Sequence, residues 1–187
     1  IKMYLIRGQH NLKLFKSRHP NVLLSGTIGN FDGLHLGHQA ILEKIKNNAQ
    51  KYNAKTIVFF TEPHAAEYFS KVRDKNQIPP PRICPWREKF QLLKKSKIDF
   101  ACFLKFNSKL RTMSPDDFIS QILDSINLVS FTVGDDFRFG AGRKGDTDLL
   151  KNWGEKKGIL VENTETVTLD GQRAVSYTHL RAHETCV

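Results

Sequence analysis

Apolar and polar positions follow a pattern that predicts strands and helices in alternation. Apolar runs of strand length occupy residues 22–28, 55–60, 98–106, 128–133 and 159–163. Between them, apolar residues recur every three or four positions, which predicts helices over residues 37–51, 86–95, 115–126 and 146–153. Strands that alternate with helices, without links of hairpin length, pair in parallel. The pattern therefore predicts an α/β fold with a mainly parallel five-stranded sheet flanked by helices.

Local signals predict a helix start and a turn at two places, whereas one long segment carries no secondary-structure signal. Ser114 is a typical N-cap residue, and Pro115 and two aspartates follow it in the first turn, where the helix dipole favours acids. Asp170-Gly171 predicts a late turn. Residues 61–85 contain three consecutive prolines and no clear periodicity, so we expect this segment to be functional or mobile.

A Rossmann-like sheet binds ligands beyond the carboxyl ends of its strands, and the stretch "TIGNFDGLHLGH" lies there, after the first predicted strand. A helix beginning near Gly37 directs free N–H groups and its positive end at the preceding loop. His35 and His38 can turn toward one anion, and Gly33 lets a phosphate approach the backbone. This arrangement favours stabilisation of a phosphoryl transition state. The alternative is a pair of hydrogen-bonded loop histidines with a structural role.

Candidate ligand-binding residues also follow the predicted fourth strand. Asp135 and Asp136 could hold Mg²⁺ or hydrogen-bond a nucleoside, and a solvated turn is the alternative. Pro63-His64 and Phe137-Arg138-Phe139 supply rings and a cation near the same edge, although the two phenylalanines could equally be core residues.

Two other patterns are weaker. Residues 140–145 match G-x-G-x-x-G, but they lie several residues past their strand, so a basic loop is the better interpretation than a dinucleotide site. His179 and His183 have the spacing of a zinc pair but no apparent third ligand, which favours a solvated tail. The sequence contains no GxxxxGK[ST] motif, which argues against a P-loop ATPase.

Composition narrows the class of protein. The 187 residues are 40% hydrophobic and 26% charged, without an apolar run of about 20 residues that could span a bilayer, so we expect one globular domain and no membrane partner. The net charge of +10 suits an anionic partner, and its dispersion along the chain leaves nucleic acid as a weak alternative. Three cysteines without a CxxC pair favour the reducing cytoplasm. The first residues lack the layout of a secretory signal, and Met3 would be a natural start.

Four stretches together carry a family resemblance. "TIGNFDGLHLGHQAIL", "PRICPWREKFQLL", "FNSKLRTMSPDDFI" and "VGDDFRFGAGRKGDTDLL" occur in this order. They resemble the N-terminal adenylyltransferase module of the bacterial bifunctional riboflavin kinase/FAD synthetase, over about residues 4–176. HxGH alone would indicate only the nucleotidylyltransferase superfamily, and the flanking GNFDG and GDDFRFG narrow the match.

The resemblance implies a nucleotidylyltransferase fold and transfer of AMP from ATP to FMN, giving FAD and pyrophosphate with Mg²⁺ as cofactor. It implies a catalytic group of Asn30, Asp32, His35 and His38. It places ATP near Gly29, Phe31, Gly33, Gly37, Gly134, Asp136, Ser176, Thr178 and Arg181. It places the flavin near Pro63, His64, Phe69, Phe137 and Phe139.

Some positions depart from the family. Thr61 and Ala65 stand where the family usually has Phe and Pro, so we expect an altered flavin pocket. We expect residues 1–175 to form the FMN adenylyltransferase domain and residues 176–187 a truncated or atypical tail, with no riboflavin kinase domain in this chain. A catalytically impaired fragment that still binds ATP or flavin is therefore the main alternative, and the oligomeric state is left open.

Overall fold

The main sheet contains six parallel strands. The computed structural model describes residues 3–31, 34, 36–63, 68–69, 86–164, 168–169 and 172–173. The strands run in the order β1-β4-β3-β2-β5-β6. Their bounds are β1 Tyr4–Arg7, β2 Leu24–Ile28, β3 Lys55–Glu62, β4 Phe100–Lys105, β5 Leu128–Gly134 and β6 Leu160–Thr164. A two-stranded antiparallel pair, β7 (Thr168–Leu169) and β8 (Gln172–Arg173), flanks the turn expected at residues 170–171, which lie outside the described residues.

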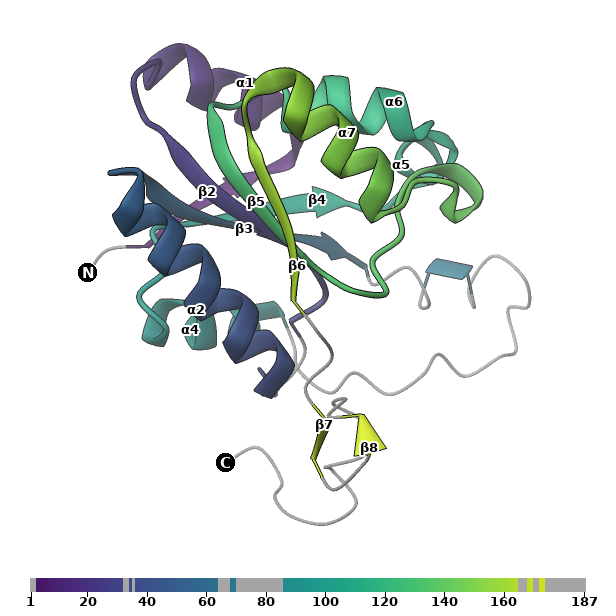
Figure 1. The fold of residues 1–187 in the computed structure, drawn as a ribbon. Coiled ribbons are helices and arrows are strands. Elements are labelled where there is room, and N and C mark those ends of the chain that lie inside the picture. The colour runs from purple at the N-terminus through teal and green to yellow at the C-terminus, as the bar shows by residue number, and fades with distance from the viewer. Residues whose placement is uncertain are drawn as a thin grey trace.

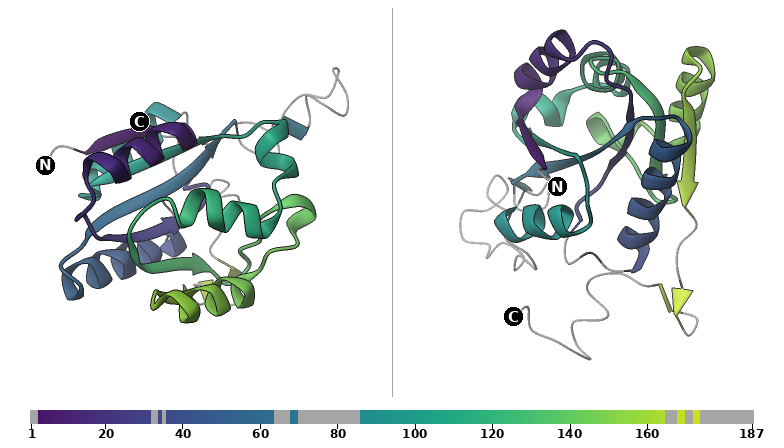
Figure 2. Two further views of the ribbon diagram at one scale, coloured as in Figure 1. Left: turned by 90° about the horizontal axis from the view of Figure 1, so that it is seen from above. Right: turned by 90° about the vertical axis from the view of Figure 1, so that its left-hand side faces the viewer.

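Helices cover both faces of this sheet and make a three-layer structure (Figures 1 and 2). Helices α2 (Leu36–Lys51) and α4 (Trp86–Lys95) lie on one face. The opposite face carries α1 (Gly8–Arg18), α5 (Ser108–Thr112), α6 (Pro115–Phe118) with the π-helix Ile119–Leu123, and α7 (Thr147–Lys157). We call these two surfaces of the sheet the α2/α4 face and the α1/α7 face.

The predicted fold class is confirmed, and the number of strands is corrected from five to six. The missed element is β1, which pairs with β4 at one edge of the sheet. Its four residues are too few for a visible periodicity. The following helix α1 has no side-chain cap and no acidic residue in its first turn, so the signals that announce a helix are also missing.

The segment after Ser114 differs from the single predicted helix. The Ser114 hydroxyl accepts a hydrogen bond from the Asp117 amide at 3.0 Å, which confirms the cap. However, α6 has only four residues and passes into the π-helix. The predicted apolar stripe is still buried, because Phe118, the π-helix and Ile126 all pack against the sheet.

The buried side chains form two clusters, one on each face. The larger cluster joins alternate residues of the strands to α1, the π-helix and α7, and includes Leu12, Phe59, Phe131 and Leu150. The smaller cluster joins the remaining strand residues to α2 and α4, and includes Ile45, Val58, Phe60 and Leu93. The sheet is therefore enclosed on both sides, as parallel sheets require.

Candidate functional site

The loop that joins β2 to α2 lies at the centre of the carboxyl edge. β2 is flanked by β3 and β5, and all five of its residues are buried. The amide of Gly29 donates to the Phe59 carbonyl at 3.1 Å, so pairing with β3 continues to the last residue before the loop. The positive end of α2 then begins at Leu36. This is the strand–loop–helix geometry that offers free amides to an anion.

Two apolar side chains anchor this loop. Phe31 and Leu34 are buried in the cluster between α2 and the sheet, and both have positive φ angles, 50° and 40°. A Cβ atom on Gly29 would approach the Phe31 ring within 3.0 Å, so glycine leaves room for that ring. The Gln39 side chain donates to the Leu34 carbonyl at 2.9 Å. Packing against the sheet and α2 thus fixes the positions of Phe31 and Leu34 in this loop.

His38 lies in the first turn of α2 and is half-buried. Its ring centroid is 4.8 Å from that of Phe31, with an angle of 37° between the planes. The loop anchor and the candidate catalytic ring therefore support each other. Gly37 and the exposed Asn30 lie on either side of the anchors, at the positions expected from the sequence.

Several predicted site residues lie outside the described residues. They are Asp32, Gly33, His35, His64, Ser176, Thr178 and Arg181. The histidine pair His179 and His183 also lies outside them.

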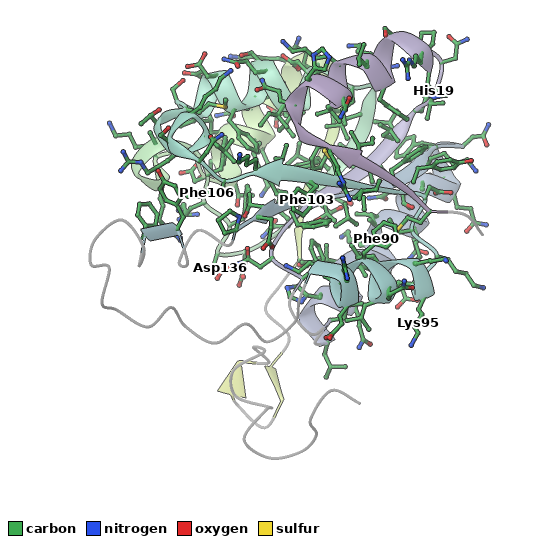
Figure 3. All side chains as sticks on the ribbon, turned by 180° about the vertical axis from the view of Figure 1, so that it is seen from behind. His19, Phe90, Lys95, Phe103, Phe106 and Asp136 are labelled. Carbon is green, nitrogen blue, oxygen red and sulfur yellow. The ribbon has the colours of Figure 1, made fainter. Side chains whose placement is uncertain are left out.

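The turn after β5 brings acidic side chains to the same edge. β5 pairs directly with β2, and its last residue is Gly134. Asp135 and Asp136 follow as exposed residues of a turn closed by a hydrogen bond from the Phe137 amide to the Gly134 carbonyl, 3.1 Å. Figure 3 shows Asp136 at the end of the sheet where Phe106 also lies. The ends of β2 and β5 therefore lie side by side at the carboxyl edge of the sheet.

The two rings after this turn have different surroundings. Phe137 and Phe139 stack with centroids 5.7 Å apart and an angle of 13°. Phe139 is 6% exposed and also packs against Phe118, so its role in the core is clear. Phe137 is only partly buried against the same cluster. Phe137 thus has the surface that a ligand could reach, while Phe139 supports it from below.

The three glycines of residues 140–145 are explained by a closed turn. Phe139 and Gly145 exchange two backbone hydrogen bonds, 3.0 and 2.9 Å. A Cβ atom on Gly145 would meet the Phe139 ring at 2.7 Å, and one on Gly140 would meet Pro115 at 2.8 Å. The Asp146 carboxylate then caps α7 through the Leu149 amide. Gly140 and Gly145 thus serve packing, and Gly142 has a positive φ of 63° that favours glycine. Both reasons are local, which supports the sequence interpretation that the motif is not a dinucleotide fingerprint.

An aromatic cluster at the ends of β3 and β4 was only partly predicted. Phe69 was expected to contact flavin, and Tyr68 and Phe106 join it with ring centroids 5.3–6.0 Å apart. The Phe106 amide donates to the Glu62 carbonyl at 3.0 Å, which holds this cluster at the carboxyl edge beside Pro63. The sequence predicts Phe106 as the last residue of a strand. Its position directly after a buried strand was the available signal.

A row of hydroxyls beneath α2 was not predicted either. Ser25 and Thr27 of β2 face Ser130 and Thr132 of β5, and all four are fully buried. The Ser130 hydroxyl donates to that of Ser25 at 2.7 Å. The hydroxyl oxygens of Thr27 and Thr132 have no hydrogen-bond partner. Gly29 and Gly134 continue this face to the carboxyl edge, so the row leads toward the candidate site.

The same face carries a polar link to the edge strand β6. Asn48 of α2 donates to a Glu162 carboxylate oxygen at 2.8 Å, and Lys44 lies 3.1 Å from the other oxygen. These contacts fix α2 over the site side of the sheet.

Sequence comparison decides the family. A sequence model described as FAD synthetase matches residues 17–178. The chain is 38% identical over 180 residues to a bifunctional riboflavin kinase/FMN adenylyltransferase of Pseudomonas fluorescens, covering 96% of this chain and 54% of that protein. The corresponding protein of Escherichia coli K12 is 38% identical over 175 residues, covering 93% and 53%. The chain belongs to the FAD synthetase family. It spans about half the length of these relatives.

Solved structures support the fold of this family member. A Streptococcus pneumoniae structure titled as a macrolide-efflux protein aligns with a TM-score of 0.75 at 19% identity, covering 97% of this chain and 65% of the other. A pantoate-beta-alanine ligase from Francisella tularensis aligns with a TM-score of 0.59 at 12% identity, covering 97% and 74%. Identities this low establish the shared fold alone. None of the described helices combines the length and apolar character needed to cross a membrane.

Proposed function

We propose that this chain is an FMN adenylyltransferase that transfers AMP from ATP to FMN, giving FAD and pyrophosphate. The observation that carries the proposal is the β2–α2 loop, which holds His38 against Phe31 at the positive end of a helix, in a chain of the FAD synthetase family. A phosphate oxygen of FMN attacks the α-phosphorus of ATP, and the bond to the β-phosphate bridging oxygen breaks. Pyrophosphate leaves with the bonding electrons.

The protein's part in this reaction is to position phosphates and stabilise charge. Negative charge grows on the leaving pyrophosphate, so fixed donors at that place lower the barrier. His38 and the free amides of α2 can supply such donors, and His35 is assigned the same role. Asn30 and Asp32 shape the phosphate turn. Arg181, with Ser176 and Thr178, is assigned to the ATP phosphates because a guanidinium can bind two oxygens at once.

The nucleoside and the flavin occupy the two sides of this loop in our proposal. Asp136 lies on the β5 side, where a carboxylate can accept hydrogen bonds from a ribose or an adenine amine. The flavin ring lies near Pro63, His64 and Phe69, and Tyr68 and Phe106 extend this aromatic wall. Phe137 provides a further partly exposed ring. Aromatic rings favour offset stacking on a planar ligand.

Mg²⁺ fits this site as an ion that arrives with ATP. The described part of the chain holds no group of three or more His, Cys, Asp or Glu side chains that could form a metal centre by itself. Mg²⁺ commonly binds one or two carboxylates together with substrate phosphates and keeps several waters. Asp135 and Asp136 provide carboxylates of that kind on the β5 turn. The ion would neutralise phosphate charge when bound.

The direct test is FAD formation by the purified chain, followed by chromatography together with pyrophosphate release. We expect FAD with ATP, Mg²⁺ and FMN, and none when riboflavin replaces FMN, because riboflavin lacks the attacking phosphate. FAD absent from the complete mixture would contradict the proposal. Binding of ATP and FMN without turnover would instead identify an impaired binding fragment.

The alternative of a nucleic-acid-binding domain came from net charge alone. The match to the FAD synthetase family adds no support to it. A reaction that consumes ATP favours a cytoplasmic location, and the buried free thiol of Cys102 agrees with a reducing compartment.

A further inference from the structure

The G-x-G-x-x-G motif of residues 140–145 has no part in the proposed reaction, and it follows Phe139 directly. The turn that it forms is closed, because Phe139 and Gly145 exchange backbone hydrogen bonds in both directions. The turn is also tied to the segment before α6, since the Ala141 amide donates to the Met113 carbonyl at 2.7 Å. The motif therefore fixes the backbone around Phe139 at two places.

The Phe139 ring is also confined by its neighbours. The ring of Phe118, the last residue of α6, packs against it with centroids 5.3 Å apart and an angle of 51°. Gly145 is buried against the same ring, where a Cβ atom would lie only 2.7 Å from ring carbons. Closely packed interiors transmit a displacement to the next side chain because they contain little free space. Phe118 and Gly145 together therefore set the position of the Phe139 ring.

Phe139 passes this position on to Phe137, the partly exposed ring of the candidate site. The two rings are nearly parallel, with centroids 5.7 Å apart and an angle of 13°. The backbone of Phe137 is held by the turn after β5, through its hydrogen bond to the Gly134 carbonyl. With the backbone fixed, the tilt of the Phe137 ring depends on the ring that supports it. A change at Gly145 should therefore reach Phe137 through Phe139.

We propose that Gly145 and Phe118 are positioning residues that hold Phe137, through Phe139, in the orientation that stacks on the flavin ring. This inference rests on the proposed function, which places the flavin near Phe137. A ring that is already fixed in its bound orientation loses less freedom when a planar ligand stacks on it. Displacing the ring should therefore weaken flavin binding, whereas a purely structural role would weaken the binding of flavin and ATP alike.

The test compares Gly145→Ala with Gly142→Ala, since each variant adds one methyl group to the same turn. At Gly142 the nearest atom to a new Cβ is 3.9 Å away in the Lys144 side chain, and φ is 63°. Gly142→Ala therefore strains the backbone without displacing the Phe139 ring. Dissociation constants for riboflavin, FMN and ATP are measured by calorimetry. Quenching of flavin fluorescence on binding reports the stacking itself.

We expect Gly145→Ala to weaken the binding of riboflavin and FMN about fivefold and to reduce the quenching, because part of an aromatic contact is lost. Riboflavin and FMN should be affected equally, since both carry the ring. The dissociation constant for ATP should stay within about twofold, as should all three constants in Gly142→Ala. In steady-state kinetics, Gly145→Ala should raise KM for FMN more than it lowers kcat.

Phe118→Leu tests the same support from the other side, and it replaces Gly145→Ala if that variant does not fold. It should weaken flavin binding and reduce the quenching in the same direction, with ATP binding unchanged. Equal weakening of flavin and ATP, an unchanged flavin affinity in the folded variants, or an equal loss in Gly142→Ala would overturn the inference. Wild-type protein that binds FMN but forms no FAD would refute the proposed function alone. Wild-type protein that binds no flavin would overturn both.

Discussion

The two faces of the sheet are built from the same strands but from different kinds of side chain. On the α1/α7 face, β2 and β5 contribute Leu24, Ile28, Phe131 and Val133, and the covering helices are apolar where they pack. On the α2/α4 face, the same strands contribute two serines and two threonines. The helices that cover this face bring a buried amide, Asn48, and the buried Lys89.

This difference separates stability from function within one sheet. Burial of apolar area is the main favourable term in folding, and the larger of the two apolar clusters lies on the α1/α7 face. The α2/α4 face gains less stability from burial of apolar area, because some of its buried side chains are polar and buried polar groups are costly where they lack partners. Both helices on this face begin at the carboxyl edge, where the candidate site lies. Changes on the two faces should therefore have different consequences.

The largest expected effect belongs to His38, at the functional end of the α2/α4 face. His38→Ala should lower the FAD formation rate at least about 10²-fold, the usual cost of removing a transition-state donor. Affinity for FMN should stay near normal, because the substitution leaves the aromatic rings that we propose to bind the flavin unchanged. Steady-state kinetics and a flavin titration measure the two effects.

His19→Ala is the matched control, because His19 is exposed at the end of α1 (Figure 3). It should leave the rate unchanged. A folded His38→Ala protein with the wild-type rate would remove the phosphate role from this ring.

The α1/α7 face should give the opposite result. Ile122 is 1% exposed in the π-helix, and Ile122→Ala leaves a cavity in the larger cluster. We expect the free energy of unfolding to fall by about 2–5 kcal/mol. The FAD formation rate at low temperature should stay within about twofold of wild type, because the site is on the other face. Denaturant unfolding and kinetics on the same samples measure both.

Leu23→Ala is its control, since Leu23 is 40% exposed at the amino edge of the sheet. It should cost less than about 0.5 kcal/mol. An Ile122→Ala protein of wild-type stability would show that the larger cluster does not carry the stability assigned to it.

The α1/α7 face also contains the thiol of Cys102, whose effect on stability can be followed as a function of pH. Burial raises the pKa of Cys102 far above its ordinary value. The folded thiol keeps its proton where the unfolded thiol loses it, so this contribution to stability is full below about pH 8.5 and is lost as pH rises above it. Relative to Cys102→Ala, wild type should lose about 1.4 kcal/mol per pH unit there, or about 2 kcal/mol at pH 10.

Urea unfolding of both proteins between pH 7 and 10 measures this difference. A difference in stability that does not change with pH would mean that the thiol ionises in the folded state. Thiol alkylation followed by mass spectrometry provides a check, since Cys102 should stay unmodified in the folded protein.

The contrast between the faces also explains what the sequence could predict. Long elements with clear periodicity, such as α2 with Ile41, Leu42, Ile45 and Ala49 inward, were found with their correct buried sides. The loop around His38 was found because glycines and histidines are distinctive at the start of a helix. The short edge strand β1 and the weakly capped α1 gave no comparable signal.

Pairing between elements that are distant in sequence was the other feature that the sequence could not predict. Ser25 and Ser130 are ordinary residues in sequence, and their row appears only when β2 and β5 pair. Phe106 joins Tyr68 and Phe69 only through the link between β3 and β4. The sequence gives no signal that Lys89 is the buried charge of its helix. Its burial depends on how α4 rotates against Phe60, which local sequence does not encode.

The smallest expected effect tests the hydroxyl row itself. The Thr132 hydroxyl is buried without a partner, so Thr132→Val should remove a desolvation cost and raise the free energy of unfolding by about 1 kcal/mol. Ser130→Ala should lower it by about 1 kcal/mol, because it breaks the 2.7 Å bond and leaves the Ser25 hydroxyl buried alone. Denaturant unfolding of the two variants measures whether the free energy of unfolding rises or falls in each. A loss of stability in Thr132→Val would mean that this hydroxyl is satisfied in solution, for example by a buried water shared with Thr27, and the cost assigned to the α2/α4 face would then be smaller than argued.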